Sequence, residues 1–584
     1  MRHLKSDIVS ENVDFNIASF LKDAAHRFEN NFVFQHKVNG QYEGVKWKEF
    51  YHKILLAAQY LKNNGFKRGD KMVIYTPNCL EMLITELAVM ACGGVAVPIF
   101  AYFKRDTANM LIEFCDPKFL IIHGEFQYNQ LNTNLNVEKI FSINEDICKK
   151  DAKVIPFSDF FNYNVIPNEQ QVLDFSIPNT EVCLNMYTSG TMGLPKCVQL
   201  THLNILSQQV ALKKIWNVNT TDRFLSYLPW HHSFGGIFEL FSALYNGACY
   251  YLESGYGKDI NGILENWKLV QPTIFFSVPK IYQTLIEQIQ IDSSIEKVFF
   301  HQNLKFIFTA AAPLPENIAN EFTKRGVKIL EGWGLTETSP CCTIGSSDNI
   351  RQPGVVGLPI PGVEIRIDDE GEIQVKGPNV MKGYYKNDEA NHSVFTEDGW
   401  FKTGDVGEIT SSGLKLVARK DRIFKLSNGE KVIPTDIEKL IEKKCCYIAH
   451  SIVYGSGKEY PVAILFPNKK FFSHPGYDQT PEQGCFCPRN IEELGKCLRG
   501  CLSQANGDIQ QKFSKIKIAA ILDKELSIDD NTLTPSLKPS PKNIINKYID
   551  HIKNLYGENV PLEEDIYVIL LDDQLKNTTY YGRN

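Results

Sequence analysis

The sequence lacks a surplus of basic side chains, since 62 lysines and arginines stand against 68 aspartates and glutamates, for a net charge of −6. Proteins that bind nucleic acid usually carry such a surplus, because it displaces the counterions of the phosphates. The charge therefore argues against a nucleic-acid partner. The 43% hydrophobic and 22% charged residues are ordinary for a globular protein, and 584 residues are enough for several domain-sized units.

Long uninterrupted apolar segments are also missing. The first eight residues contain no apolar stretch of signal-peptide length. The most apolar window, residues 87–100, is interrupted by Gly93, Gly94 and Pro98 and is too short to span a bilayer. We therefore expect a soluble, cytoplasmic protein, with peripheral contact to a membrane left open.

Zinc knuckles are poorly represented among the 15 cysteines, which are scattered as reduced intracellular thiols usually are. One cluster has a C-x-C pair, Cys485 and Cys487, followed by a C-x3-C pair, Cys497 and Cys501. Structural zinc usually takes its ligands from C-x2-4-C pairs on turns, which this cluster matches poorly. We expect free thiols here.

From about residue 70 to residue 335, short apolar runs alternate with helical patterns. The predicted strands are 71–75, 224–228, 273–277, 306–309 and 328–331, and the predicted helices are 81–92, one opening at Pro279, and 313–324. Repeated strand-then-helix order predicts a large domain of α/β sheet layers.

The rhythm changes past residue 360. Short strands at 363–367, 372–375 and 414–417, joined by glycine turns, predict a small β-barrel-like subdomain. An α+β series from Asp421 ends in a predicted helix, 541–555. We therefore expect an N-terminal domain of residues 1–420, a smaller C-terminal domain of residues 421–556 and a tail of residues 557–584, to which no role can be assigned.

The segment 187–196, YTSGTMGLPK, concentrates the hydroxyls of Thr188, Ser189 and Thr191, two glycines and Lys196 in one turn. Glycines let backbone N–H groups approach phosphate oxygens, hydroxyls add donors and the lysine adds charge. The segment is not a Walker P-loop, which requires G-x4-G-K-[ST]. Composition alone does not distinguish it from any other polar loop.

The other motifs in the sequence distinguish this segment from an ordinary polar loop. Seven motifs occur in order along the chain, at residues 187–196, 228–232, 309–313, 332–337, 399–405, 419–425 and 533–538. With them the sequence resembles the adenylate-forming (AMP-binding) superfamily, which comprises acyl-CoA synthetases, aryl-CoA ligases, luciferases and peptide-synthetase adenylation domains. The resemblance covers roughly residues 70–556, and the stretch 516–556 most resembles long-chain fatty acyl-CoA synthetases.

The resemblance implies a nucleotide site. Asp405 corresponds to the aspartate that accepts hydrogen bonds from the ribose hydroxyls, Arg419 to an arginine that reaches the nucleotide, and Trp333 to the aromatic residue on adenine. The full implied set is Thr188, Ser189, Gly190, Thr191, Gly193, Lys196, Ala311, Ala312, Pro313, Gly332, Trp333, Gly334, Thr336, Asp405, Arg419 and Lys425.

It also implies catalytic roles. Glu337 and Thr188 would hold Mg²⁺, and Lys538 would reach the reacting carboxylate and α-phosphate. His232 would act as a gate between the acyl pocket and the phosphates or would orient the carboxylate. Asp421 corresponds to the hinge about which the C-terminal domain moves. A metal site at the tandem His231-His232 is disfavoured, because adjacent side chains diverge and no further ligand accompanies them.

The implied reaction joins a medium- or long-chain fatty acid to coenzyme A through an acyl-adenylate, with ATP as co-substrate and AMP and pyrophosphate as products. An aryl acid, or an acyl carrier protein in place of free CoA, are alternatives. A nucleotide-binding protein without turnover is disfavoured by Lys196, Glu337, Asp405 and Lys538. Met192 and Cys197 depart from the usual loop pattern, so nucleotide affinity is the property that they put in doubt. Oligomeric state is not determined by the sequence.

Overall fold

The computed structural model describes residues 3–162, 167–188, 196–310, 314–345, 351–352, 354–445, 447–468, 488, 490–528, 530–534, 538–558, 560 and 566–572. Within these residues the chain divides into two compact units. The larger contains the residues up to Thr403 and Gly407–Val417, and the smaller contains Gly404–Val406 and the residues from Ala418 onward. None of the helices in the described ranges has both the length and the apolar character needed to cross a membrane.

An eight-stranded sheet forms the first layer of the larger unit, in the order β20-β10-β9-β5-β4-β6-β7-β8. Its strands are β4 (Lys71–Tyr75), β5 (Val95–Pro98), β6 (Phe119–Ile122), β7 (Lys139–Ser142), β8 (Val154–Pro156), β9 (Val182–Thr188), β10 (Lys196–Thr201) and β20 (Gly383–Tyr384). Strands β4 to β8 are parallel, whereas β10 runs antiparallel to both β9 and β20. The sheet thus ends in a hairpin and one short strand from far along the chain.

A nine-stranded sheet follows in the order β17-β16-β15-β14-β13-β11-β12-β2-β3. Its strands are β2 (Phe32–Val38), β3 (Gln41–Lys46), β11 (Arg223–Ser226), β12 (Cys249–Leu252), β13 (Ile274–Ser277), β14 (Phe306–Thr309), β15 (Lys328–Trp333), β16 (Thr343–Ile344) and β17 (Leu358–Pro359). The parallel pairing of β11, β13, β14 and β15 confirms the predicted α/β rhythm.

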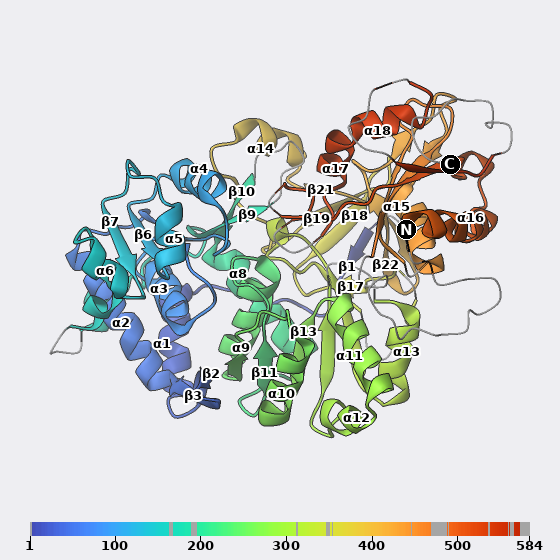
Figure 1. Cartoon of the computed structure of the whole chain (residues 1–584). Coiled ribbons are helices and arrows are strands. Elements are labelled where there is room, and N and C mark those ends of the chain that lie inside the picture. Colours follow the sequence, from blue (N-terminus) through green and yellow to red (C-terminus); the bar gives the residue numbers. More distant parts are fainter. Residues whose placement is uncertain are drawn as a thin grey trace. The chain divides into compact units, whose positions relative to one another are not determined.

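Helices connect and cover these strands, as the green α8 to α11 around β11 and β13 in Figure 1 illustrate. The helices of the larger unit are α1 (Ile17–Arg27), α2 (Trp47–Asn63), α3 (Leu80–Ala91), α4 (Arg105–Cys115), α5 (Glu125–Gln130), α6 (Asp146–Lys150), α7 (Glu169–Val172), α8 (His202–Ile215), α9 (Leu240–Asn246), α10 (Ile260–Val270), α11 (Pro279–Ile291), α12 (Ser294–Phe299), α13 (Glu316–Lys324) and α14 (Asp388–Val394). Proline in the first turn of α11, as predicted, occupies a position whose N–H has no helical partner.

The predicted β subdomain is confirmed as a five-stranded sheet in the order β1-β18-β19-β21-β22. Its strands are β1 (His3–Lys5), β18 (Glu364–Ile367), β19 (Glu372–Lys376), β21 (Phe401–Thr410) and β22 (Gly413–Arg419). The turn between β21 and β22 requires glycine: Gly413 has φ +123°, and a Cβ there would lie 2.3 Å from the carbonyl oxygen of Gly357.

The smaller unit is α+β, with a four-stranded sheet in the order β25-β26-β27-β28. Its elements are β23 (Phe424–Lys425), β24 (Lys431–Val432), α15 (Pro434–Lys444), β25 (Ile448–Tyr454), β26 (Val462–Pro467), α16 (Ile491–Asp508), β27 (Ile518–Ile521), α17 (Pro541–Lys547), α18 (Ile549–Asn554) and β28 (Tyr567–Leu570). The sheet has a core on each face, because alternate residues such as Ala519 and Ala520 belong to different clusters.

Two features of this unit go beyond the sequence analysis. The single helix predicted for residues 541–555 is wrong in one respect, since α17 ends at Lys547 and α18 begins at Ile549, with Tyr548 between them at φ −108° and ψ 24°. The apolar run 566–571, which had no assigned role, provides β28, an antiparallel partner of β27.

Candidate active site

The segment that resembles a phosphate loop is the connection of the β9–β10 hairpin. Thr188 and Lys196, the last residue of β9 and the first of β10, are directly opposed Cα partners. The loop residues Ser189, Gly190, Thr191, Met192 and Gly193 lie outside the described residues, as do Ala311, Ala312 and Pro313. The hairpin therefore places Thr188 and Lys196 opposite each other at the two ends of the connecting segment.

A buried cluster supports the base of this hairpin. The Tyr187 hydroxyl donates a hydrogen bond of 2.7 Å to the carbonyl of Leu111 and lies 2.9 Å from the Cys115 sulfur. Cys197, paired with Tyr187 across the hairpin, is buried in the same apolar cluster. Burial raises the pKa of the Tyr187 phenol, and a hydrogen bond with Cys115, together with burial, raises the pKa of the Cys197 thiol, so both stay uncharged. Cys197 thus serves as a packing residue at the base of the hairpin.

The 332–337 motif lies at the carboxyl end of β15, where α/β folds place ligands. Gly334 is required by close approach, because a Cβ there would lie 1.7 Å from the carbonyl oxygen of Pro340. Trp333 is 8% exposed, and its carbonyl accepts from the N–H of Cys342 at 2.8 Å. The Glu337 side chain is nearly buried, at 9% exposed. A buried carboxylate at this edge of the sheet needs a partner.

That partner is Tyr384, which the sequence analysis did not single out. Its hydroxyl donates to Oε1 of Glu337 at 2.8 Å, and the ammonium of Lys196 lies 4.6 Å from the centroid of its ring. One tyrosine therefore contacts two of the predicted site residues. No local signal in the sequence marks it, because Tyr384 reaches the site only by the pairing of β20 with β10.

The tandem histidines precede an irregular helix. His231 lies 5.0 Å from the ring of Phe100, and burial lowers its pKa to about 3, so it is neutral. His232 accepts a hydrogen bond from the N–H of Phe234 at its Nδ1, 3.2 Å away. The two rings thus have different neighbours, in line with the argument against a metal at this pair. The hydroxyl of the next residue, Ser233, lies 3.0 Å from that of Thr336. Residues 231–233, the histidine segment, therefore lie beside the 332–337 motif.

Residues 234–239 form a π-helix, an element that occurs mostly as short insertions and often near functional sites. Its two glycines are required by crowding: a Cβ at Gly236 would lie 2.0 Å from the carbonyl oxygen of Trp230. Phe234 and Phe238 on this helix pack against Phe276 and Phe308 of the adjoining strands. The surroundings of the histidine segment are therefore apolar and aromatic.

The smaller unit contains the other predicted nucleotide contacts. Nη1 of Arg419 lies 3.1 Å from Oδ1 of Asp405, and its Nε lies 3.7 Å from Oδ1 of Asp421. The Asp405 side chain is 13% exposed. Lys425 is exposed on β23, opposite Lys431 of β24. One arginine thus connects the predicted ribose aspartate with the predicted hinge residue.

The backbone of Lys538 is hydrogen-bonded to that of Thr534. Leu533 bridges Pro539, the N–H of Thr534 donates to the Lys538 carbonyl at 2.8 Å, and the Lys538 N–H donates to the Thr534 hydroxyl at 3.1 Å. Burial lowers the pKa of the Lys538 ammonium below its ordinary value. The backbone of the predicted catalytic lysine is thereby anchored within its own unit.

The residues of the larger unit fit a magnesium ion. Tyr384 contacts both Glu337 and Lys196, and Lys196 is paired with Thr188 across the hairpin. The Glu337 carboxylate and the Thr188 hydroxyl are therefore linked through two intermediate residues. Among the described residues no group of three or more His, Cys, Asp or Glu side chains gathers into a protein cage. Mg²⁺ suits such a site, because it commonly takes one or two protein oxygens and completes its shell with water and nucleotide phosphates.

Comparison with known proteins decides the family. Residues 21–385 match the AMP-binding enzyme family, and residues 421–559 match the AMP-binding enzyme C-terminal domain. The chain belongs to the AMP-binding, adenylate-forming enzymes. It is an acid–thiol ligase of the AMP-forming, acyl- or aryl-CoA ligase type.

Two curated relatives and one solved structure illustrate the match. Long chain acyl-CoA synthetase 2 of Arabidopsis thaliana is 25% identical, with 92% of both chains covered. Long-chain-fatty-acid–CoA ligase 5 of Mus musculus is 26% identical, with 89% of this chain and 85% of the relative covered. The O-succinylbenzoate coenzyme A synthetase of Bacillus subtilis, in complex with ATP and magnesium ion, is similar in fold, with a TM-score of 0.70 at 21% identity over 90% of this chain and 99% of that one.

Proposed function

We propose that this enzyme activates a medium- or long-chain fatty acid and transfers it to coenzyme A. The observation that carries the proposal is the match to relatives named long-chain acyl-CoA synthetases, which extends over 92% of both lengths in the first case.

In the first half-reaction the acid's carboxylate attacks the α-phosphorus of ATP, and pyrophosphate leaves. The loop between Thr188 and Lys196 would hold the phosphates, and His232 would orient the attacking carboxylate. Mg²⁺ held by Glu337 and Thr188 would neutralise phosphate charge. Lys538 would stabilise the charge that develops on the five-coordinate phosphorus, which is the kind of preorganised electrostatic contribution that dominates many enzymes.

In the second half-reaction the thiolate of CoA attacks the acyl carbonyl, and AMP leaves. Asp405 and Arg419 would hold the ribose and the nucleotide in both steps, and movement about Asp421 would exchange the adenylating arrangement for the thioester-forming one. The side chains act by positioning and charge, so the reaction requires no nucleophile from the protein.

An aryl acid is the second candidate. The similar fold of an O-succinylbenzoate coenzyme A synthetase favours it. Transfer to the phosphopantetheine of an acyl carrier protein in place of free CoA is a variant of either.

The deciding experiment measures pyrophosphate release over a panel of medium-chain, long-chain and aryl acids, each without acceptor, with CoA and with a carrier protein. We expect the highest kcat/KM with a fatty acid and CoA. Preference for an aryl acid would replace the fatty-acid proposal, and turnover only with the carrier protein would replace the CoA proposal. Release of no pyrophosphate with any acid would contradict an adenylating function altogether.

A further inference from the structure

We propose that Tyr384 is a positioning residue, which fixes the Glu337 carboxylate for Mg²⁺ and carries the Lys196 ammonium on its ring. The inference rests on the proposed function, since it assumes that Glu337 and Lys196 serve Mg·ATP. Tyr384 belongs to none of the motifs on which the family resemblance rests.

The contacts of the Tyr384 side chain are of two different kinds. Its hydroxyl donates 2.8 Å to Oε1 of Glu337, and its ring centroid lies 4.6 Å from Nζ of Lys196. The first is a hydrogen bond to an ionisable group, which is stronger than one between neutral groups. The second is a cation–π contact. Tyr384 therefore contacts the two predicted site residues through different parts of one side chain.

Tyr384 itself has little freedom. Its side chain is 4% exposed, and its backbone pairs with Val198 of β10, two residues after Lys196. Asn391 of α14 fixes the same backbone from the other side: its Oδ1 accepts from the Tyr384 N–H at 2.7 Å, and its Nδ2 donates to the Tyr384 carbonyl at 3.0 Å. The ring is therefore a preset surface for the lysine.

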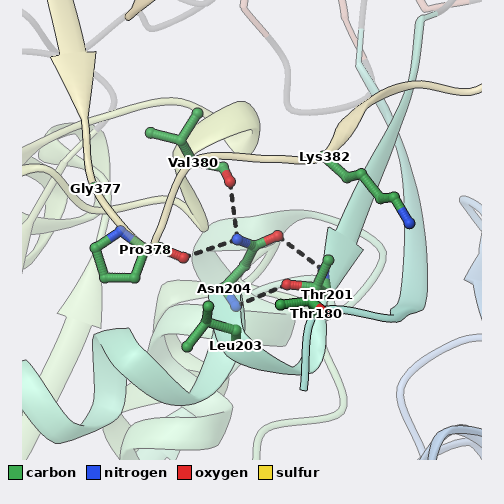
Figure 2. Close-up of a pocket in the computed structure, with 8 residues that line it drawn as sticks. All are labelled: Thr180, Thr201, Leu203, Asn204, Gly377, Pro378, Val380 and Lys382. Carbon is green, nitrogen blue, oxygen red and sulfur yellow. Dashed lines mark hydrogen bonds between the residues drawn. The ribbon is translucent and has the colours of Figure 1, made fainter. Parts of the chain in front are cut away.

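The segment before Tyr384, residues 377–382, is bound to the rest of the larger unit. Figure 2 shows Nδ2 of Asn204, at the start of α8, donating to the carbonyls of Pro378 and Val380, each at 2.8 Å. Gly377, Pro378, Val380 and Lys382 of this segment line part of a pocket of about 430 Å³. The two hydrogen bonds from Asn204 fix the point at which the chain enters β20.

The segment also holds the backbone around Glu337. The N–H of Met381 donates to the Glu337 carbonyl at 2.8 Å, and Nδ2 of Asn379 donates to the Thr338 carbonyl at 3.0 Å. Residues 377–384 thus fix both the main chain and the carboxylate of Glu337. A carboxylate whose one oxygen accepts a hydrogen bond presents the other oxygen in a single orientation. In metalloproteins, hydrogen bonds of this kind orient the side chains that bind the metal.

Two substitutions separate the two contacts. Tyr384→Phe removes the hydrogen bond and keeps the ring, and we expect the Mg²⁺ concentration that supports half-maximal ATP binding to rise about tenfold. Tyr384→Leu removes both the hydrogen bond and the ring, so its affinity for ATP at saturating Mg²⁺ should be roughly threefold weaker than that of Tyr384→Phe. Tyr385→Phe is the control, because it removes the hydroxyl of the neighbouring tyrosine, whose ring packs on Phe114. It should change neither the Mg²⁺ requirement nor the affinity for ATP at saturating Mg²⁺.

Calorimetric titration of the full-length protein with ATP at several Mg²⁺ concentrations, without acid, measures both quantities, and the thermal midpoint is recorded for each variant. A changed Mg²⁺ requirement in Tyr384→Phe at an unchanged midpoint supports the inference. An unchanged requirement, or binding weakened equally at every Mg²⁺ concentration together with a lower midpoint, overturns it. Failure of the wild-type protein to bind Mg·ATP would instead contradict the proposed function and remove this inference with it.

Discussion

The guanidinium of Arg419 lies 3.1 Å from the carboxylate of Asp405, which resembles the aspartate that binds ribose in adenylate-forming enzymes. The same guanidinium lies 3.7 Å from Asp421, at the predicted hinge. The Arg419 side chain is 41% exposed, so these ion pairs contribute little to folding stability. Their value is positional, because one arginine orients the carboxylate that we propose to accept hydrogen bonds from the ribose.

We predict that Asp405→Asn raises the KM for ATP by about 10- to 100-fold, because hydrogen bonds to a charged acceptor contribute about 1.5–3 kcal/mol. The specific check is 2′-deoxy-ATP. The wild-type enzyme should discriminate against it, whereas the variant should discriminate less, since one partner of the ribose contact is already weakened. Equal discrimination by both proteins would show that Asp405 does not contact the ribose.

We predict that Lys538→Ala lowers the adenylation rate by about 100-fold or more, because removal of one preorganised charge or donor commonly has that effect. ATP binding without acid should change little. Lys553→Ala is a matched control, since Lys553 pairs with Asp550 on the surface of the same unit. Pyrophosphate release by Lys538→Ala at the wild-type rate would refute the role given to this lysine.

The pH dependence of adenylation should carry the signature of the same lysine. Burial lowers the pKa of Lys538, so its charge is present at low pH and is lost, as pH rises, earlier than that of a free lysine. The rate should therefore fall on the alkaline side. In Lys538→Arg, whose charge persists to higher pH, the residual activity should lack this fall. An alkaline limb that persists in Lys538→Arg would assign it to another group.

We predict that Asp421→Pro spares adenylation but slows thioester formation at least severalfold, because a hinge needs backbone rotation that proline restricts. Asp421→Ala keeps the backbone free and is the control. Single-turnover measurements of pyrophosphate release and of acyl-CoA formation separate the two half-reactions. Equal loss of both in Asp421→Pro would place the hinge elsewhere.

A stability prediction concerns Glu86, which lies on α3 and is 2% exposed. Burial raises its pKa to about 8, so the folded protein keeps it uncharged up to that pH, while the unfolded chain ionises it above about 4.3. Its contribution to stability is present below the unfolded pKa and is lost as pH rises toward 8, by at most about 1.4 kcal/mol per pH unit. Glu86→Gln should flatten the fall in the urea midpoint between pH 5 and 8 relative to wild type. Glu113→Gln, at an exposed position on α4, should not.

Much of the architecture could be predicted locally. Strands β4 and β14 have the predicted bounds, because buried parallel strands are continuous apolar runs bounded by turns. The break at Tyr548 between α17 and α18 could not be predicted, because no glycine or proline interrupts the sequence there. The role of residues 566–571 could not be predicted either, because the apolar run does not show that β28 pairs with β27.

The candidate site shows the same division. The roles of five residues were predicted because each residue belongs to a contiguous motif that resembles one of the adenylate-forming family: Thr188, Lys196, Glu337, Asp405 and Lys538. Tyr384 was not found, because its significance comes from a short strand laid against β10 almost two hundred residues away in sequence and from a bond to Glu337. The reaction class follows from the family, which contiguous motifs in the sequence are enough to indicate. The support of the reacting groups depends on long-range strand pairing and close packing, which no local pattern encodes.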